Sequence, residues 1–311
     1  MGTRADALRK HGRGGTLVMK VSQVYGRGKF GLSFELFPPK TPAGETEMFH
    51  HVGRLIDFRP DFITCTYGAG GSTRAKTLEI VEQVQRQFGC PVASHLTCVG
   101  STKDELRAYL QDATARGIDN IVALRGDPPQ GQSEFKAVAG GLSYANELVS
   151  LIRQEFPAFG VAVAGYPETH REAASPEADL ENLRRKVDCG ADVVITQLFY
   201  DNDDFWRFRD RCEHAGIRVP IVPGILPVTN LAQIQRIASL CAARLPSDFS
   251  TALQQSAASA EGQFAVGVEF ATRQVQALID RGVAGVHFYV LNKSPATAGV
   301  LRSVSLPRPS A

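Results

Sequence analysis

The stretch Asp188-Cys189-Gly190-Ala191-Asp192-Val193-Val194-Ile195-Thr196-Gln197-Leu198 decides the fold class. It follows an amphipathic pattern over Asp179–Cys189, turns at Gly190 and continues as an apolar run over Val193–Thr196. Glycine suits the position just past a helix end, because that residue often needs a left-handed backbone. The stretch therefore predicts a helix, a tight joint and a buried strand that ends in the polar side chain of Gln197.

The same succession recurs along the chain. Further glycine joints are Arg116-Gly117-Ile118-Asp119, Ala215-Gly216-Ile217 and Arg281-Gly282-Val283. The eight apolar runs are Gly31–Phe34, Phe62–Thr66, Val92–Ser94, Asn120–Ala123, Gly160–Ala164, Val193–Thr196, Ile221–Val222 and Gly285–Tyr289. Amphipathic patterns between them include Ala75–Phe88, Lys103–Arg116, Tyr144–Phe156, Asp179–Cys189, Asp203–Ala215 and Leu231–Ala242.

Strands that alternate with helices imply parallel pairing, because each return must cross over the sheet. An open doubly wound sheet would show the same joints, but eight units favour an α/β fold of the (β/α)8 TIM barrel type. We expect a flexible N-terminal extension over residues 1–28, a single catalytic barrel over residues 29–306 and a tail over residues 307–311. The stretch Leu245–Gly262, rich in Ser, Ala and Gln, predicts an additional helical insertion before the last strand.

The charge balance and the cysteines limit the possible function classes. A formal net charge of +2 does not indicate the strongly basic surface of a nucleic-acid-binding protein. The six cysteines form no C-x-x-C pair, which argues against a zinc site and a disulfide framework. Residues 1–20 lack the apolar stretch of a secretory signal, and no apolar run is long enough to span a bilayer. We therefore expect a cytoplasmic protein without a bound metal.

Catalytic groups of such barrels lie at the carboxyl ends of the strands, so the residues after each apolar run are candidates. Glu35 follows the first run and lies between Phe34 and the pair Leu36-Phe37. Apolar surroundings raise the pKa of a carboxyl, which suits it to general-acid chemistry near neutral pH. The alternative is a structural ion pair between Glu35 and a nearby Arg or Lys.

Polar and glycine-rich segments follow the next three runs. They are Thr66-Tyr67-Gly68-Ala69-Gly70-Gly71-Ser72-Thr73, Ser94-His95-Leu96-Thr97-Cys98 and Leu124-Arg125-Gly126-Asp127-Pro128-Pro129. The glycines allow a flat ligand or a phosphate to approach the backbone, but Thr73 breaks the dinucleotide fingerprint, so a plain loop is the better interpretation of that segment alone. A single His95 at a strand end is often structural. The prolines after Asp127 favour an extended backbone after the strand and restrict the movement of this acid.

The fifth run leads into Gly165-Tyr166-Pro167-Glu168-Thr169-His170, and the next helix carries Asp179, Asn182 and Lys186 on one face. An acid, an amide and an amine in a row can bind ribose hydroxyls and phosphate, although a polar helix face is usually only solvated. Gln197 offers a donor and an acceptor to the edge of an amide-like heterocycle. Without a metal cluster or a Ser/His/Asp set, these groups indicate a planar cofactor rather than hydrolysis.

Taken together, these segments resemble the methylenetetrahydrofolate reductase family. The resemblance runs from about Phe30 to Lys293 and consists of eight motifs in the family's order. They are Phe34-Glu35-Leu36-Phe37-Pro38-Pro39, Thr66-Tyr67-Gly68-Ala69, His95-Leu96-Thr97-Cys98, Leu124-Arg125-Gly126-Asp127, Tyr166-Pro167-Glu168-Thr169-His170, Thr196-Gln197-Leu198-Phe199, Pro223-Gly224-Ile225-Leu226-Pro227 and His287-Phe288-Tyr289-Val290-Leu291-Asn292. Any one of these motifs is weak, but eight in order leave little room for chance.

The resemblance implies FAD at the barrel mouth, where NAD(P)H and 5,10-methylenetetrahydrofolate take turns in a ping-pong reaction that yields 5-methyltetrahydrofolate. Implied contacts to the flavin and ribityl portion come from Thr66, His95, Arg125, Gly126, Asp127, Tyr144 and Ala145. Implied contacts to the adenosine diphosphate portion come from Tyr166, His170, Asp179, Asn182 and Lys186. By similarity, Glu35 is the general acid that protonates N10 and opens the ring to a 5-iminium cation. Asp127 stabilises that cation and binds the pterin together with Gln197.

Two positions depart from the family pattern. Lys293 stands where an arginine often pairs with the folate glutamate tail, so the charge is kept but the bidentate fork is lost. Leu231 stands where an aromatic residue commonly stacks on folate and nicotinamide.

The resemblance also implies a homo-oligomer that acts on small molecules, with no nucleic-acid or membrane partner. Another oxidoreductase on this fold, a folate-dependent methyltransferase and an inactive flavin- or folate-binding subunit remain as alternatives.

Overall fold

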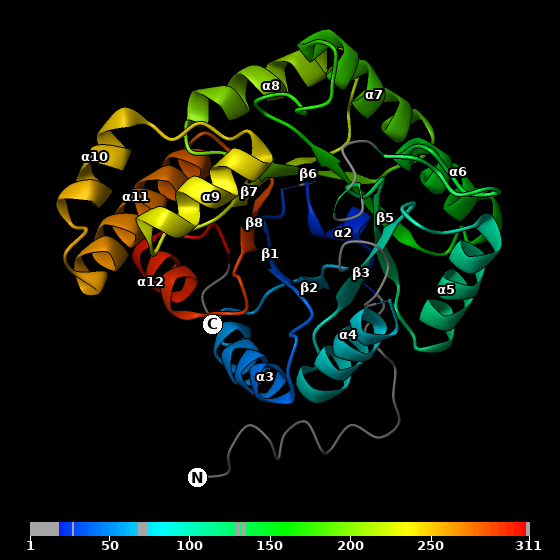
Figure 1. Cartoon of the computed structure of the whole chain (residues 1–311), viewed down its shortest axis with the longest axis horizontal. Helices are drawn as coiled ribbons and strands as arrows, with labels where there is room; N and C mark the ends of the chain where they lie inside the picture. The colour runs from blue at the N-terminus through cyan, green and yellow to red at the C-terminus, as the bar shows by residue number, and fades with distance from the viewer. Residues whose placement is uncertain (1–18, 27, 68–73, 129–130, 132–134, 309–311) are drawn as a thin grey trace.

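The structure, a computed structural model, describes residues 19–26, 28–67, 74–128, 131 and 135–308. Eight strands form a closed barrel in which each strand pairs in parallel with the next and β8 pairs with β1 (Figure 1). The strands are β1 (Gly31–Leu36), β2 (Phe62–Cys65), β3 (Val92–Thr97), β4 (Asn120–Leu124), β5 (Gly160–Gly165), β6 (Val193–Leu198), β7 (Ile221–Ile225) and β8 (Gly285–Tyr289). The predicted barrel is confirmed, since each apolar run corresponds to one strand.

Helices surround the barrel, as Figure 1 shows. Along the chain they are α3 (Pro42–Ile56), α4 (Arg74–Phe88), α5 (Lys103–Ala115), α6 (Ala145–Glu155), α7 (Pro176–Asp188), α8 (Asn202–His214), α9 (Leu231–Cys241), α10 (Ser247–Gln255), α11 (Ala260–Asp280) and α12 (Pro295–Ser303). The expected insertion is confirmed as α10 and the first residues of α11, between β7 and β8. Among the described helices, none is long and apolar enough to cross a membrane.

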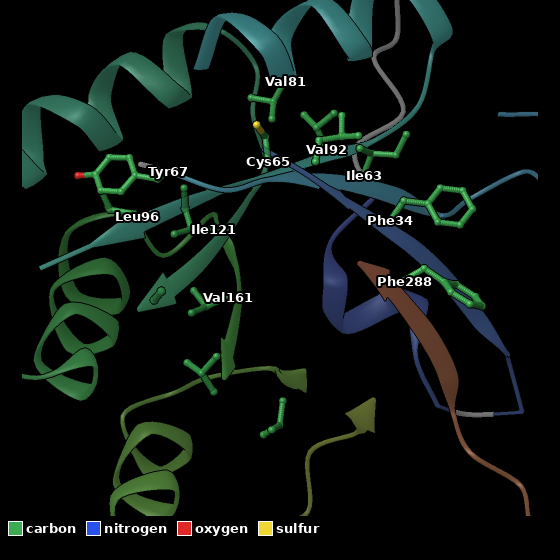
Figure 2. Close-up of a cluster of buried hydrophobic side chains, with 14 of the residues drawn as sticks. Phe34, Ile63, Cys65, Tyr67, Val81, Val92, Leu96, Ile121, Val161 and Phe288 are labelled. Atoms are coloured by element: carbon green, nitrogen blue, oxygen red, sulfur yellow. The ribbon is translucent and has the colours of Figure 1, made fainter. Parts of the chain in front are cut away.

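Alternation along each strand separates two packed layers. Residues such as Phe34, Ile63 and Phe288 point outward and form the main core with the surrounding helices (Figure 2). The rings of Phe34 on β1 and Phe288 on β8 lie 6.3 Å apart, so the closing strand pair is packed on this outer side. Consequently the adjacent strand residues Glu35 on β1 and His287 on β8 face the barrel interior.

The amino-terminal end of the barrel is closed by a short helix, α2 (Val21–Val24). Val21 and Val24 are buried against inward-facing residues of the strands, and Asn120 of β4 anchors the segment. The side-chain oxygen of Asn120 accepts from the backbone N–H of Val21 at 2.8 Å, and its amide donates to the carbonyl of Met19 at 2.9 Å. Packed structure therefore begins before residue 29, where the sequence placed the start of the barrel.

The chain's final described residues also bind this lower end. Arg308 donates to the carbonyls of Phe30 at 3.0 Å and Arg59 at 2.7 Å, and it forms an ion pair with Asp61. The first and the last described residues thus both stabilise the amino-terminal side of the barrel.

Candidate active site

The Glu35 carboxylate lies inside the barrel near the carboxyl end of β1, between two histidines. His95 on β3 places Nε2 3.3 Å from Glu35 Oε2, and His287 on β8 places Nε2 3.5 Å from the same oxygen. The Glu35 side chain is 18% exposed, whereas both imidazoles are almost fully buried. The fold therefore brings Glu35 and His95 together as expected. Among the described residues, the ionisable partners of Glu35 are these two histidines, in place of the Arg or Lys of the structural alternative.

The pKa of Glu35 is shifted in the direction opposite to the one expected. Burial, the largest single influence, raises this pKa, but His95 and His287 together outweigh it and lower the pKa to about 2. The expected rise rested on Phe34 and Leu36, whose side chains pack in the outer core and face away from the carboxylate. That expectation was wrong, because the charges across the barrel matter more than the neighbours in sequence.

A chain of hydrogen bonds continues from His287 toward the lower end of the barrel. His287 Nδ1 lies 2.7 Å from Ser33 Oγ, and Ser33 Oγ lies 2.6 Å from Tyr25 Oη. If Ser33 donates to Nδ1, a neutral His287 carries its proton on Nε2, which faces Glu35. None of the three was predicted as a site residue, although His287 belongs to the eighth motif. Strand alternation could have found two of them, since Ser33 lies two residues before Glu35 and pairs with His287 in the β1–β8 register.

The loop after β4 contains the expected residues Arg125, Gly126 and Asp127. Arg125 Nη2 forms a 2.8 Å ion pair with Glu172, which follows β5, and its guanidinium lies 5.1 Å from the ring centre of Phe135. Asp127 is exposed at the mouth. The Arg125–Glu172 pair ties two mouth loops together, and Glu172 was not predicted from the sequence.

Gly126 occupies a position that excludes any side chain. Its φ is +88°, and an added Cβ would lie 2.7 Å from Val99 Cγ1 and 3.1 Å from Thr97 Cβ. A left-handed backbone disfavours other residues, and contact with a packed neighbour adds a second cost. The absent side chain therefore lets the backbone of this loop lie close to the end of β3.

Gly126→Ala is expected to destabilise the protein by about 1–3 kcal/mol more than Gly117→Ala, because only the first change creates a clash. Gly117 is the matched control, with φ of +71° and nothing within 4 Å of an added Cβ. Urea unfolding of both variants measures the difference. Equal destabilisation would contradict the close approach at Gly126.

A second cluster joins the loop after β5 to helix α7. The rings of Tyr166 and His170 meet edge to face with centres 4.6 Å apart, and Asp179 Oδ2 accepts from the backbone N–H of His170 at 3.0 Å. Thr169 between them has a φ of 74°, which is rare for a β-branched residue. Asp179 thus holds a strained loop in place. Asn182 lies on the same helix and is exposed.

Lys186 is the most unusual residue of this cluster. Its Nζ donates to the carbonyl of Ala164 at 2.5 Å and lies 5.9 Å from the ring centre of Tyr166. Burial lowers the pKa of Lys186 to about 8, and the charge of Asp179 offsets only part of this effect. A partly desolvated ammonium favours the approach of an anion.

The remaining predicted residues lie at the same side of the barrel, at strand ends or helix starts. Tyr144 precedes α6 and is 62% exposed, and Ala145 is the first residue of that helix. Gln197 lies on β6, where its Oε1 accepts from the backbone N–H of Leu198 at 2.8 Å. Lys293 is exposed after β8. Thr66 directly follows β2, and its backbone N–H donates to the carbonyl of Leu36 at 2.8 Å.

The structure gives no position for two of the segments named in the sequence analysis. The glycine-rich residues 68–73 and Pro129 lie outside the part of the chain that the structure describes. Leu231, at the position where the family commonly has an aromatic residue, is the first residue of α9 and packs against the cluster that contains Leu226 and Val228.

Comparison with known proteins identifies the family. The family model described as methylenetetrahydrofolate reductase matches residues 20–305. The chain belongs to this family. The 5,10-methylenetetrahydrofolate reductase of Salmonella typhimurium is 40% identical over 280 residues, which cover 90% of this chain and 92% of that protein.

Longer relatives also occur in the methylenetetrahydrofolate reductase family. The protein named methylenetetrahydrofolate reductase (NADH) 1 of Arabidopsis thaliana is 39% identical over 300 residues, which cover 93% of this chain and 51% of that protein. The chain therefore spans about half the length of the plant relatives it matches.

Similarity among solved structures agrees with the barrel fold. An uncharacterised protein from Clostridium thermocellum, described as binding two copies of 5-methyl-5,6,7,8-tetrahydrofolic acid, has a TM-score of 0.61 at 14% identity. The match covers 88% of this chain and 93% of that protein. At this identity the likeness concerns the fold alone.

Proposed function

We propose that the protein reduces 5,10-methylenetetrahydrofolate to 5-methyltetrahydrofolate with NAD(P)H through bound FAD. The family supports the reaction, and the observation that carries the proposal is the pair of half-buried charged groups, Glu35 and Lys186, in the same half of the barrel. The first is a carboxylate between two histidines at the carboxyl end of β1, and the second is an ammonium that donates to the carbonyl of Ala164. Such a pair suits a reductase that holds an anionic cofactor beside a proton donor.

The residues present fit FAD. Lys186 offers a buried cation for the diphosphate, while Tyr166 and His170 offer ring surfaces for the adenosine portion. Asp179 and Asn182 lie on the same helix as Lys186 and complete this adenosine diphosphate site. Gly126 keeps the loop after β4 free of a side chain beside β3.

The flavin end of the same cofactor lies over the barrel mouth in this proposal. Its contacts come from Thr66, His95, Arg125 and Asp127, with Tyr144 and Ala145 at the start of α6. When bound, FAD supplies the hydride chemistry that no side chain can supply.

Glu35 delivers a proton to N10 of the folate. Its pKa of about 2 means that the carboxyl is ionised in this structure and must take up a proton when substrate binds. His95 is one of the two imidazoles that favour the ionised form, so a movement of His95 toward a ligand raises the pKa of Glu35 and favours that uptake. Exclusion of water by the bound substrate acts in the same direction.

Asp127 and Gln197 recognise the pterin from two sides of the mouth. The exposed carboxylate of Asp127 stabilises positive charge that develops on the substrate. Gln197 uses its oxygen for the backbone N–H of Leu198, which leaves the amide N–H groups to donate to the ligand. The two residues thus combine charge with directed hydrogen bonding.

Lys293 binds the carboxylates of the folate glutamate tail. Lys293→Arg is expected to lower the KM for methylenetetrahydrofolate by about threefold, because a guanidinium binds a carboxylate in a bidentate manner. The KM for NAD(P)H serves as the internal reference and should stay the same. Lys29→Arg, at the opposite end of the barrel, is the matched control. A KM for folate that is unchanged in Lys293→Arg would remove Lys293 from the substrate site.

The proposed function is tested with protein purified together with FAD. NADH and NADPH are each supplied with methylenetetrahydrofolate, and methyltetrahydrofolate is quantified, with menadione as an alternative electron acceptor. Product formation supports the proposal. Menadione reduction without folate product favours another oxidoreductase or a binding subunit, and folate turnover without bound flavin favours a methyltransferase. We further propose that the protein is cytoplasmic and forms a homo-oligomer. Light scattering of the same sample tests the oligomeric state.

A further inference from the structure

The side chain of Asn292 forms a double hydrogen bond to the backbone of one residue across the barrel seam. Its Nδ2 donates to the carbonyl of Phe37 at 2.8 Å, and its Oδ1 accepts from the backbone N–H of Phe37 at 3.0 Å. This is the pattern that a strand neighbour would provide. Asn292 therefore continues the β1–β8 pairing beyond the last paired residues, Glu35 and Tyr289.

The backbone that presents this side chain is strained. Leu291 has a φ of 48° and Asn292 a φ of 58°, so two consecutive residues other than glycine adopt the left-handed conformation. Asparagine tolerates this conformation, whereas leucine does not. Strain of this kind persists only where surrounding contacts enforce it, and it is common at ligand sites.

The double hydrogen bond lies between two groups of the proposed site. The carbonyl of Glu35 accepts from the backbone N–H of Val290 at 3.4 Å, and the backbone N–H of Lys293 donates to Val290 at 2.8 Å. One short turn thus connects the general acid on β1 to the cation after β8. A shift of Asn292 would move both.

Phe37, the residue held by Asn292, is 41% exposed. The apolar residues of β1 are buried, so the Phe37 ring directly after the strand is the one that this strand end presents to solvent. It lies two residues after Glu35, at the carboxyl end of the strand. An exposed aromatic ring on a backbone that two hydrogen bonds fix offers a stacking surface to a flat heteroaromatic ligand.

We propose that Asn292 is a positioning residue that fixes Phe37 as an aromatic wall of the folate site. The proposal rests on the proposed function and identifies the part of the site that recognises the substrate's rings. NAD(P)H–menadione reduction takes place without folate, so it serves as the reference reaction for this wall. Loss of the double hydrogen bond therefore weakens folate binding selectively.

Asn292→Gly tests the proposal because glycine keeps the left-handed backbone and removes only the side-chain hydrogen bonds. We expect the KM for methylenetetrahydrofolate to rise by about fivefold to tenfold, with NAD(P)H–menadione reduction within about twofold of the wild type. Phe37→Leu is expected to raise the same KM without changing the turn. Asn292→Ala adds the cost of an unfavourable backbone and should also lower the melting temperature.

The outcomes distinguish the possible failures. A wild-type protein that reduces menadione but not methylenetetrahydrofolate would overturn the proposed function and this inference together. With an active wild type, an unchanged folate KM in Asn292→Gly would overturn the inference alone. Equal loss of both activities together with a lower melting temperature would assign Asn292 a merely structural role. An unchanged KM in Phe37→Leu would remove the ring from the substrate site.

Discussion

Glu35→Gln is expected to reduce methyltetrahydrofolate formation by about 10²- to 10⁴-fold while NAD(P)H–menadione reduction continues. Glutamine preserves the size of the side chain but can neither take up nor deliver the proton. The carboxylate lies within 3.5 Å of two histidines in the barrel interior, where a water molecule is a poor replacement for it. Steady-state assays with both electron acceptors measure the effect.

The control for this variant is Glu79→Gln, which removes an exposed carboxylate on α4. It should leave both reactions within about twofold of the wild type, as surface changes usually do. Loss of both reactions in Glu35→Gln would indicate a role in folding or cofactor binding. Full retention of folate reduction would exclude Glu35 as the general acid.

Lys186→Met is expected to weaken FAD binding by about 10- to 100-fold, the effect of removing one hydrogen bond to a charged group. The same change should leave the FAD-free protein as stable as the wild type or more stable, because it removes a buried ammonium with one carbonyl acceptor. Weaker FAD binding together with equal or higher stability would indicate that Lys186 serves to bind an anion. Flavin fluorescence titration and thermal unfolding measure the two quantities.

The pH dependence provides a second test of Lys186. Its folded pKa of about 8 lies below the ordinary value of 10.5, so the unfolded chain binds more protons between these two values. Stability of the FAD-free protein should therefore rise as the pH increases from about 8 to above 10. FAD affinity should fall over the same range, since the neutral amine no longer attracts the diphosphate. In Lys186→Met both dependences should be reduced, whereas Lys29→Met should retain them.

The barrel could be predicted because its signals are local. A glycine after a helix end, followed by an apolar run as in Cys189–Thr196, recurs in four of the units, and the count of eight apolar runs favours a barrel over an open sheet. The closure of β8 on β1 then places every strand end at one mouth, so Glu35 and His95 meet although they lie far apart in sequence. The packing of Val21 and Val24 into the lower end was missed, because four residues give no periodic signal.

The electrostatics of the site could not be predicted from the sequence in the same way. The pKa of Glu35 depends on His287, which is remote in sequence and became a neighbour only through barrel closure. Similarly, the lowered pKa of Lys186 follows from burial that a polar helix face does not predict. The Arg125–Glu172 ion pair joins two loops whose conformations depend on the rest of the mouth.

In the proposed reaction, one bound flavin accepts electrons from NAD(P)H and donates them to methylenetetrahydrofolate. Anaerobic stopped-flow absorbance near the flavin maximum tests it most directly: FAD in the purified protein is reduced with NADH or NADPH and then mixed with methylenetetrahydrofolate. Rapid reoxidation with formation of methyltetrahydrofolate, lost in Glu35→Gln while nicotinamide still reduces the flavin, is the predicted result. Flavin that nicotinamide reduces but methylenetetrahydrofolate does not reoxidise would contradict the assigned substrate.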